Sequence, residues 1–189
     1  MTRLILTDID ETVLMCADRL QLFVEQAMGR PALRRLRDHY RVDEAFGITP
    51  EQSMEMIHDF WRDGAFGHLA PETCAAAVLP SLHALGWHFV AISACPGEPG
   101  LVAARARNLR DAFGFEWDGV HCVGEDKSAC LKRYAPAVWV EDNWHNGVIG
   151  AEIGHRAYML DRPHNGGREH PLVRRVADWH EIRRDLGSP

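Results

Sequence analysis

Hydrophobic residues along this chain fall into two alternating patterns, short continuous runs and runs with helical spacing. Continuous apolar runs of a few residues are typical of strands that are buried on both faces of a sheet. Such strands are predicted at residues 3–8, 87–92, 119–123, 137–140 and 157–160. Between the strands, apolar residues recur with the spacing of one helix face. Helices are predicted at residues 13–29, 31–39, 49–63, 71–86, 99–113, 128–131, 145–153 and 174–185.

Strands and helices that alternate along a chain predict a parallel sheet with helices on both faces. The expected fold class is therefore α/β, with a three-layer, Rossmann-like core. Roughly 60 residues of mostly helical pattern, however, separate the first strand from the second, whereas a βαβ crossover needs only about a dozen. We therefore expect residues 15–70 to form an inserted helical cap, and residues 1–14 and 71–189 to form the α/β core.

Within the expected cap, residues 40–48 are predicted to be a loop. The next segment, residues 49–52, is typical of a helix N-terminus, with Thr at the N-cap, Pro at the first helical position and Gln three residues after the cap. Three aromatic residues have two interpretations, as the lining of a pocket for a flat ring or as a small core within the cap. They are Phe46, Trp61 and Phe66.

Composition restricts the function classes. The net charge is -6, with 46% hydrophobic and 25% charged residues, as in an ordinary soluble globular protein. A negative net charge argues against a dedicated binder of long nucleic acid but allows small anionic substrates held through a metal. No apolar run is long enough to span a bilayer, and the first residues lack the pattern of a secretory signal, so a cytoplasmic protein is expected. The cysteines and histidines form no zinc-binding pattern, which favours a reduced protein without zinc.

Polar residues follow four of the predicted strands at the point where each strand ends. They are Asp8 and Asp10 after the first strand, Ser93 after the second, Lys127 after the third, and Glu141 and Asp142 after the fourth. The carboxyl ends of parallel strands meet at one edge of a sheet, so these side chains are expected to lie together. Carboxylates without imidazole or thiolate favour Mg²⁺, and a hydroxyl and an ammonium suit phosphate oxygens. An aspartate is in addition a competent nucleophile for forming a phosphoenzyme.

Each of these residues also has a simpler interpretation when it is taken alone. The two aspartates after the first strand are compatible with an acidic turn, Ser93 with an ordinary turn residue and Lys127 with a surface lysine. The acidic pair after the fourth strand would also be favoured by the dipole at a helix N-terminus. The shared position of all four groups at strand ends favours a single site.

These motifs resemble those of phosphatases of the haloacid dehalogenase superfamily, and the resemblance covers essentially the whole core. The four motifs are residues 8–12 (Asp-Ile-Asp-Glu-Thr, for Asp-x-Asp-x-Thr), Ser93, Lys127, and Glu141-Asp142 with Asn146. The helical insertion between the first and second motifs resembles the C1 cap of the superfamily.

Within the superfamily, the chain is most similar to the 5′(3′)-deoxyribonucleotidase group. The similarity rests on the short helical cap, the Glu-Asp-Asn-x-x-Asn segment at 141–146, two segments at 154–157 and 160–165, and a late Asp-Trp pair at 178–179. Glu11 is a departure, since many relatives have glycine there. The Asp-Glu-Thr form also resembles the bacterial acid phosphatases of the superfamily.

The resemblance implies a Mg²⁺ ion bound by Asp8, the backbone carbonyl of Asp10 and Asp142, with Glu141 orienting a water of the metal. It implies further that Asp8 attacks phosphorus, and that Asp10 protonates the leaving oxygen and later deprotonates the hydrolytic water. Thr12 would hold Asp10 in place. The phosphoryl oxygens would be bound by Ser93, the adjacent backbone N–H groups such as that of Ala94, and Lys127.

The expected function is Mg²⁺-dependent hydrolysis of a small phosphate monoester through an aspartyl phosphate, with a nucleoside monophosphate as substrate. Asp10 favours ester hydrolysis over dehalogenation, which needs no proton donor at that position. One alternative is a 3′-phosphatase that acts on nucleic-acid ends. Another is a non-catalytic phosphoacceptor or binding module, although receiver domains need neither the Asp-x-Asp-x-Thr spacing nor a long helical insertion.

Overall fold

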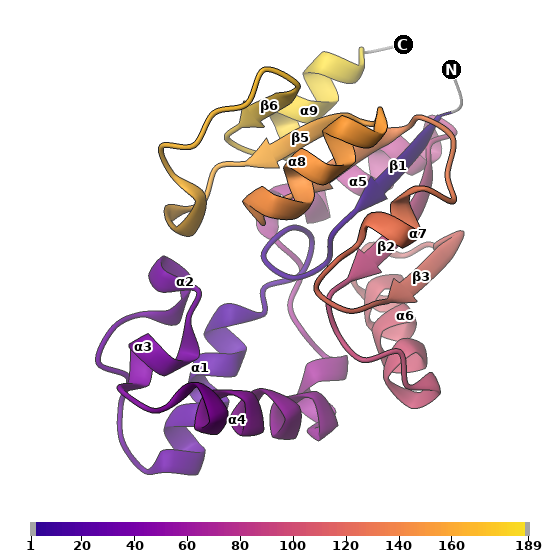
Figure 1. Ribbon diagram of the computed structural model, residues 1–189. Helices are drawn as coiled ribbons and strands as arrows, with labels where there is room; N and C mark the ends of the chain where they lie inside the picture. The colour runs from indigo at the N-terminus through magenta and orange to yellow at the C-terminus, as the bar shows by residue number, and fades with distance from the viewer. Residues whose placement is uncertain (1–2, 188–189) are drawn as a thin grey trace.

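A six-stranded parallel sheet forms the centre of the computed structural model, which describes residues 3–187 (Figure 1). Its strands are β1 (Leu4–Thr7), β2 (His88–Ser93), β3 (Gly119–Cys122), β4 (Val138–Glu141), β5 (Arg156–Leu160) and β6 (Val173–Val176). They lie in the order β3-β2-β1-β4-β5-β6, and each neighbouring pair is parallel. The order reverses between β1 and β4, and an α/β sheet binds its ligands outside the carboxyl ends of the strands at such a point.

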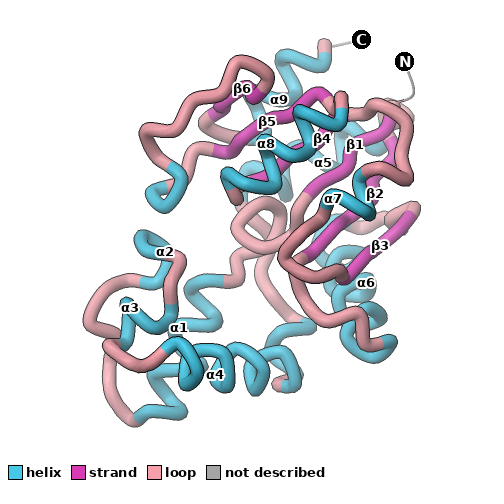
Figure 2. Tube along the Cα trace, in the orientation of Figure 1, coloured by secondary structure: helices cyan, strands magenta, loops and turns pink. Residues whose placement is uncertain are grey.

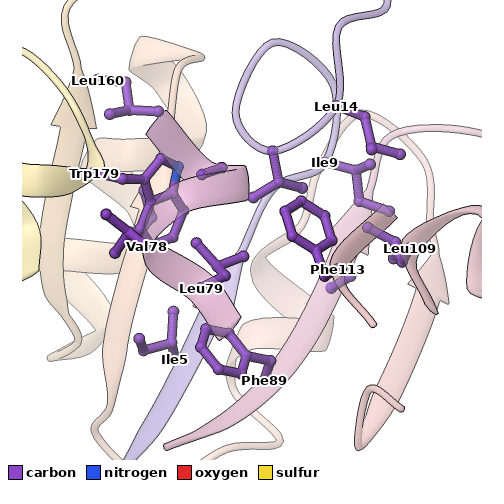
Figure 3. Packing of buried hydrophobic residues seen from close by; sticks show 14 of the residues in the cluster. Ile5, Ile9, Leu14, Val78, Leu79, Phe89, Leu109, Phe113, Leu160 and Trp179 are labelled. Carbon is purple, nitrogen blue, oxygen red and sulfur yellow. The ribbon is translucent and has the colours of Figure 1, made fainter. Parts of the chain in front are cut away.

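Helices cover both faces of this sheet (Figure 2). One hydrophobic core joins the sheet to α5 (Thr73–Ala84), α6 (Pro99–Phe113) and α9 (Trp179–Leu186), and another joins it to α7 (Ser128–Leu131) and α8 (Trp144–Ile153). Neighbouring residues of a strand belong to different cores, as alternating side chains require: Ile5 packs in the first and Leu6 in the second. Figure 3 shows Ile5 and Phe89 in the first core together with Val78 of α5 and Trp179 of α9. The predicted three-layer α/β fold is therefore confirmed.

Two glycines let α8 lie close to the sheet. A Cβ atom at Gly150 would lie 2.2 Å from Cδ1 of Trp139 in β4, and one at Gly147 would lie 2.2 Å from Cε of Met159 in β5. Side chains at these positions would force the helix away from the strands. The close packing holds the N-terminal end of α8 beside the end of β4, where the predicted acidic pair is found.

The residues between β1 and α5 form a group of helices beside the sheet, here called the helical segment (residues 17–67; Figure 1). It contains α1 (Ala17–Met28), α2 (Leu36–His39), α3 (Val42–Phe46), α4 (Pro50–Arg62) and a 3₁₀ turn, η1 (Gly64–Gly67). These helices bury a small core of their own, which includes Leu36 and Phe46. At the start of α4, Thr49 and Gln52 form the predicted capping box. No helix within residues 3–187 is long and apolar enough to cross a membrane.

Two predictions within the helical segment are wrong in part. Residues 40–48, predicted to be a loop, contain α3, because Val42, Ala45 and Phe46 share a buried face over little more than one turn. Only the last turn of the helix predicted at 31–39 is helical, as α2. Patterns of this length are too short to show a period.

The helix predicted at 174–185 is divided into a strand and a shorter helix, β6 and α9. Val173 and Val176 have the i, i+3 spacing of a helix face, but both are buried in a strand that pairs in parallel with β5. Asp178 then accepts a hydrogen bond from the Glu181 N–H (3.0 Å) and begins α9. The sheet therefore has one strand more than the sequence predicts.

Candidate active site

The acidic residues after β1 and at the end of β4 lie together at the carboxyl edge of the sheet. Asp8 continues β1 by donating its backbone N–H to the Val140 oxygen of β4 (2.9 Å). One carboxylate oxygen from each of Asp8, Glu141 and Asp142 lies within 4.8 Å of the others, and all three residues are buried. These three residues are called the acidic cluster below. Acids from the first and fourth strands thus converge, as their positions at strand ends predict.

Lys127 contacts two members of the acidic cluster. Its Nζ donates to Glu141 Oε1 at 2.8 Å and also to Asp8 Oδ1, and the residue is only 1% exposed. Through Oε2, Glu141 accepts two further hydrogen bonds, from the backbone N–H groups of Asp142 (2.8 Å) and Asn143 (3.2 Å). Lys127 and Glu141 are therefore firmly held, and the ammonium faces the proposed nucleophile.

The Asp142 carboxylate has the character of a metal ligand. It is 1% exposed, and neither of its side-chain oxygens accepts a hydrogen bond from the described residues. His164 Nε2 lies 3.2 Å from Oδ2 but is hydrogen-bonded to the backbone oxygen of Asp142 (3.1 Å). Buried carboxylate oxygens without hydrogen-bond donors, next to two further acids, fit a hard divalent cation.

The charge balance of the cluster points to the same conclusion. Burial raises the pKa of Asp8 to about 7, although the Lys127 ammonium acts to lower it. Burial also raises the pKa values of Glu141 and Asp142. Burial alone would lower the pKa of Lys127, but the adjacent Asp8 and Glu141 carboxylates raise it, so the ammonium stays charged. Burial would lower the pKa of His164, but the adjacent Asp142 carboxylate raises it, so this ring is a second source of positive charge beside the three acids. A metal ion would supply the remaining positive charge.

The second aspartate, Asp10, is held by a hydroxyl and a guanidinium. Ser93 Oγ donates to its Oδ2 at 3.1 Å, and Arg105 Nη2 donates to its Oδ1 at 2.6 Å. The Asp10 side chain is 21% exposed and lines a cavity, whereas Asp8 is almost fully enclosed among charges. Two aspartates that are neighbours in sequence thus have different environments, and Asp10 has the access that proton exchange with a ligand requires.

The remaining predicted site residues lie nearby with fewer contacts. Thr12 is buried, but its hydroxyl has no hydrogen-bond partner within residues 3–187. The side chains that hydrogen-bond to Asp10 are therefore others than Thr12. Ala94 is exposed at the end of β2. Asn146 is 4% exposed, and its side-chain oxygen accepts no hydrogen bond from the described part of the chain. Ala94 and Asn146 line the same cavity as Asp10.

This cavity has a volume of about 690 Å³ and is lined both by loops at the sheet edge and by the helical segment. The lining from the helical segment is largely apolar and includes Leu20, Leu36, Met54, Ile57, Trp61 and Phe66. Two of the three aromatic residues, Phe46 and Phe66, are buried in hydrophobic cores, and a pocket for a flat ring stays a prediction. Trp61 and Phe66 line the cavity, whereas Phe46 is 0% exposed in the core of the helical segment.

Glu11 connects the loop after β1 to the helical segment. Its Oε1 accepts hydrogen bonds from the backbone N–H groups of Cys16 (2.8 Å) and Ala17 (2.7 Å) at the start of α1. Its backbone oxygen accepts from Arg162 Nε (3.1 Å) and Nη2 (2.9 Å). The backbone φ is 58°, a left-handed conformation that glycine adopts most easily. Glutamate at this position is therefore strained in its backbone, but its side chain caps the N-terminus of α1, which glycine could not do.

Two residues near the site, Arg105 and Tyr40, have no signal in the sequence that identifies them, and His164 lies in the 160–165 segment without a predicted role. Arg105 is one of several arginines on α6. The rings of Tyr40 and His164 stack with their centroids 4.5 Å apart, where α2 packs against the 3₁₀ turn η2 (Pro163–Asn165). The stack links the helical segment to the loop that contacts Asp142. Only this tertiary packing brings the two rings together.

Comparison with known proteins gives structural matches only. No family model and no curated protein matches the chain. Among solved structures, an L-2-haloacid dehalogenase matches with a TM-score of 0.62 and 19% identity, over 99% of this chain and 100% of the other. CbbY from Rhodobacter sphaeroides, in complex with phosphate, matches with a TM-score of 0.63 and 19% identity, over 96% of each chain. A hydrolase of the HAD (haloacid dehalogenase) family from Deinococcus radiodurans, with bound phosphate and sodium, matches with a TM-score of 0.62 and 16% identity, over 98% of this chain and 95% of the other.

The chain has the haloacid dehalogenase fold. The alignments with these structures span 96% to 99% of it. The acidic cluster lies at the switch point between β1 and β4 of this fold, and Asp10 and Asn143, close to it in sequence, line the cavity.

Proposed function

We propose that this chain is a Mg²⁺-dependent phosphomonoesterase that forms an aspartyl phosphate on Asp8. The observation that carries the proposal is the buried contact between Asp8 and Lys127, at the sheet edge where Glu141 and Asp142 also lie. A carboxylate that attacks an anionic phosphate needs positive charge beside it, and the ammonium is already in place. Similarity in fold to a CbbY structure in complex with phosphate supports the same class of reaction.

Mg²⁺ would be held by Asp8, Asp142 and the backbone carbonyl of Asp10. The two carboxylates belong to the acidic cluster, and the oxygens of Asp142 have no hydrogen-bond donors among the described residues. The ion would offset the negative charge that a phosphate adds to an acidic site. Glu141, which is fixed by Lys127 and two backbone N–H groups, would orient a water beside the ion.

The chain's own residues serve both halves of the reaction. The Asp8 carboxylate forms a bond to phosphorus while the ester P–O bond breaks, and Asp10, which must hold a proton at the start of this step, gives it to the leaving oxygen. Asp10 then takes a proton from the water that attacks phosphorus, which breaks the aspartyl phosphate and releases inorganic phosphate. Lys127 and the Ala94 N–H bind the phosphoryl oxygens in both steps, whereas Ser93 gives its single O–H to Asp10.

A nucleoside monophosphate is the proposed substrate because the cavity offers an aromatic side chain close to the phosphate site. Trp61 lines it together with Asp10. Its volume of about 690 Å³ lies within the range of sites for small organic ligands. The proposal assigns residues 15–70 to a cap that sets specificity, and residues 1–14 and 71–189 to the catalytic core.

A panel of phosphate esters tests the proposal with purified protein, assayed for released phosphate with Mg²⁺ and after its removal by EDTA. The panel contains p-nitrophenyl phosphate, ribo- and deoxyribonucleoside monophosphates, sugar phosphates and a 3′-phosphorylated oligonucleotide. Hydrolysis that requires Mg²⁺ and is fastest on a nucleoside monophosphate supports the proposal. Preference for the oligonucleotide would assign a 3′-phosphatase instead.

Asp8→Asn tests the nucleophile, because the amide cannot form the acyl phosphate. It should abolish phosphate release, whereas Asp111→Asn, which changes an exposed carboxylate on α6, should leave the rate unchanged. Activity close to wild type in Asp8→Asn would remove Asp8 as the nucleophile. Halide release from 2-haloacids without phosphate release would replace the phosphatase with a dehalogenase.

A further inference from the structure

Arg105 is a buried arginine whose guanidinium reaches the proposed acid, Asp10. It lies on α6 and is 0% exposed. Its Nη2 donates to Asp10 Oδ1 at 2.6 Å, a short, charge-assisted hydrogen bond across 95 residues of sequence. No sequence motif includes this arginine, and no step of the proposed reaction uses it.

The other polar atoms of Arg105 show that Asp10 is its main polar partner. Nε and Nη1 are buried and donate to no acceptor within residues 3–187. A buried arginine that serves only to link elements together is expected to have most of its five N–H donors bonded. A buried charge is unfavourable unless it is paired, so the position of Arg105 is explained by its contact with Asp10.

An aromatic ring restricts the guanidinium on another side. Cζ of Arg105 lies 4.4 Å from the centre of the Phe66 ring, a cation–π contact. Phe66 belongs to η1 of the helical segment and lines the cavity that Asp10 also lines. Ser93 meanwhile donates to the other oxygen of Asp10, so each carboxylate oxygen is held by a different donor.

We propose that Arg105 is a positioning residue that, together with Ser93, fixes the orientation of the Asp10 carboxylate toward the leaving oxygen of the substrate. Through Phe66, this orientation also depends on the helical segment. Proton transfer is efficient only when the donor oxygen is held within hydrogen-bond reach of the leaving oxygen, and a carboxylate with two fixed partners cannot rotate freely. The inference rests on the proposed phosphatase reaction, with Asp10 as its acid.

A comparison of leaving groups tests this role. 2,4-Dinitrophenolate leaves without a proton, whereas the alcohol of a nucleoside monophosphate needs one. For each ester, kcat/KM reports only the steps up to release of that leaving group. In Arg105→Met, kcat/KM for the nucleoside monophosphate should fall about 100-fold, the lower range of general acid catalysis. The value for 2,4-dinitrophenyl phosphate should change by less than about threefold, because that step needs no acid.

Three further variants calibrate the comparison. Asp10→Asn supplies the reference, because it should show the same selective loss. Arg107→Met is the matched control, since Arg107 is exposed two residues further along α6 and its loss should leave both rates unchanged. Arg105→Lys keeps the charge but not the planar fork, so its selective loss should be smaller than that of Arg105→Met.

The inference is overturned if a folded Arg105→Met loses activity equally on the two esters or loses none. The proposed function remains intact in that case if Asp10→Asn loses activity selectively on the nucleoside monophosphate. If Asp10→Asn itself shows no selectivity, the assignment of the acid fails, and the inference fails with it. Circular dichroism and thermal unfolding identify the folded variants. If Arg105→Met does not fold, Arg105→Lys and Phe66→Leu test the inference instead. Both should lower kcat/KM for the nucleoside monophosphate more than for 2,4-dinitrophenyl phosphate, by a smaller factor than expected for Arg105→Met.

Discussion

The helical segment lines the cavity, which the acidic cluster adjoins in sequence through Asp10 and Asn143, and the two regions are built in opposite ways. In the cluster, buried charged side chains extend from adjacent strands, β1 and β4, whose register places Thr7 opposite Val140. In the helical segment, short helices pack around a small core of their own and reach the loop after β5 through side-chain contacts such as the Tyr40–His164 stack. The backbone therefore positions the charges, whereas individual side chains shape the wall that faces them.

This difference separates reaction chemistry from substrate choice. Strands buried on both faces cannot shift without disrupting two cores, so the positions of the acids do not depend on what occupies the cavity. Side chains on the cavity wall can change without moving the sheet. A substitution in the cluster should therefore affect every ester and the stability of the fold, and one in the wall should affect only some substrates.

The largest effect is expected from Lys127→Met. Asp8 and Glu141 would remain buried side by side without their ammonium, so the free energy of unfolding without Mg²⁺ should fall by about 3–5 kcal/mol. Hydrolysis of every ester should be lost as well. Urea unfolding followed by tryptophan fluorescence in EDTA measures the first effect, and phosphate release measures the second.

Lys132→Met is the matched control for this substitution. Lys132 is exposed at the end of α7, five residues further along the chain, and its loss should change stability by less than about 0.5 kcal/mol. An equally small change in Lys127→Met would contradict the view that Lys127 offsets the buried acids.

A smaller and more selective effect is expected from Trp61→Ala in the cavity wall. Loss of an aromatic face against a nucleobase should remove about 1–3 kcal/mol of stacking, which lowers kcat/KM for the nucleoside monophosphate roughly 5- to 150-fold. Ribose 5-phosphate, which has the sugar and the phosphate but no base, should be hydrolysed at the wild-type rate. Steady-state kinetics on the two esters provide the measurement. A loss of equal size on both would place Trp61 outside the binding of the base.

The positions of the charged groups could be predicted because a parallel sheet converts sequence order into spatial position. Asp8, Lys127 and Glu141 each follow or end a strand, and the carboxyl ends of all parallel strands meet at one edge. Arg105 could not be predicted in this way. In sequence it resembles the exposed Arg107 on the same helix, and only the packing of α6 against η1 buries it beside Asp10.

The fold was predictable where the patterns are long and was not where they are short. The helix Pro99–Phe113 and the strand His88–Ser93 have enough residues to show a period, and both lie where the sequence predicts them. β6 has only four residues, and the spacing of its two valines suits a helix as well as a strand. Pairing with β5 decides between them, and pairing is a tertiary property.

The smallest effect is expected at the joint between the two regions, where Glu11 caps α1 from the loop that carries Asp8 and Asp10. Glu11→Ala should lower the free energy of unfolding by about 1 kcal/mol, and so should Glu72→Ala, because Glu72 caps α5 by accepting from the Ala75 N–H. Glu11→Gly should lose less than Glu11→Ala, since glycine relieves the left-handed backbone at φ 58°.

Thermal or urea unfolding ranks these three variants by stability, and kinetics then distinguish the two caps. Only the Glu11 variants should also lower kcat/KM, because only that cap holds the loop with the nucleophile and the acid against the helical segment. If Glu11→Ala loses stability but keeps the wild-type kcat/KM, the sheet alone positions Asp8 and Asp10. Any influence of the helical segment on the acid would then pass through other contacts, such as the one proposed between Phe66 and Arg105.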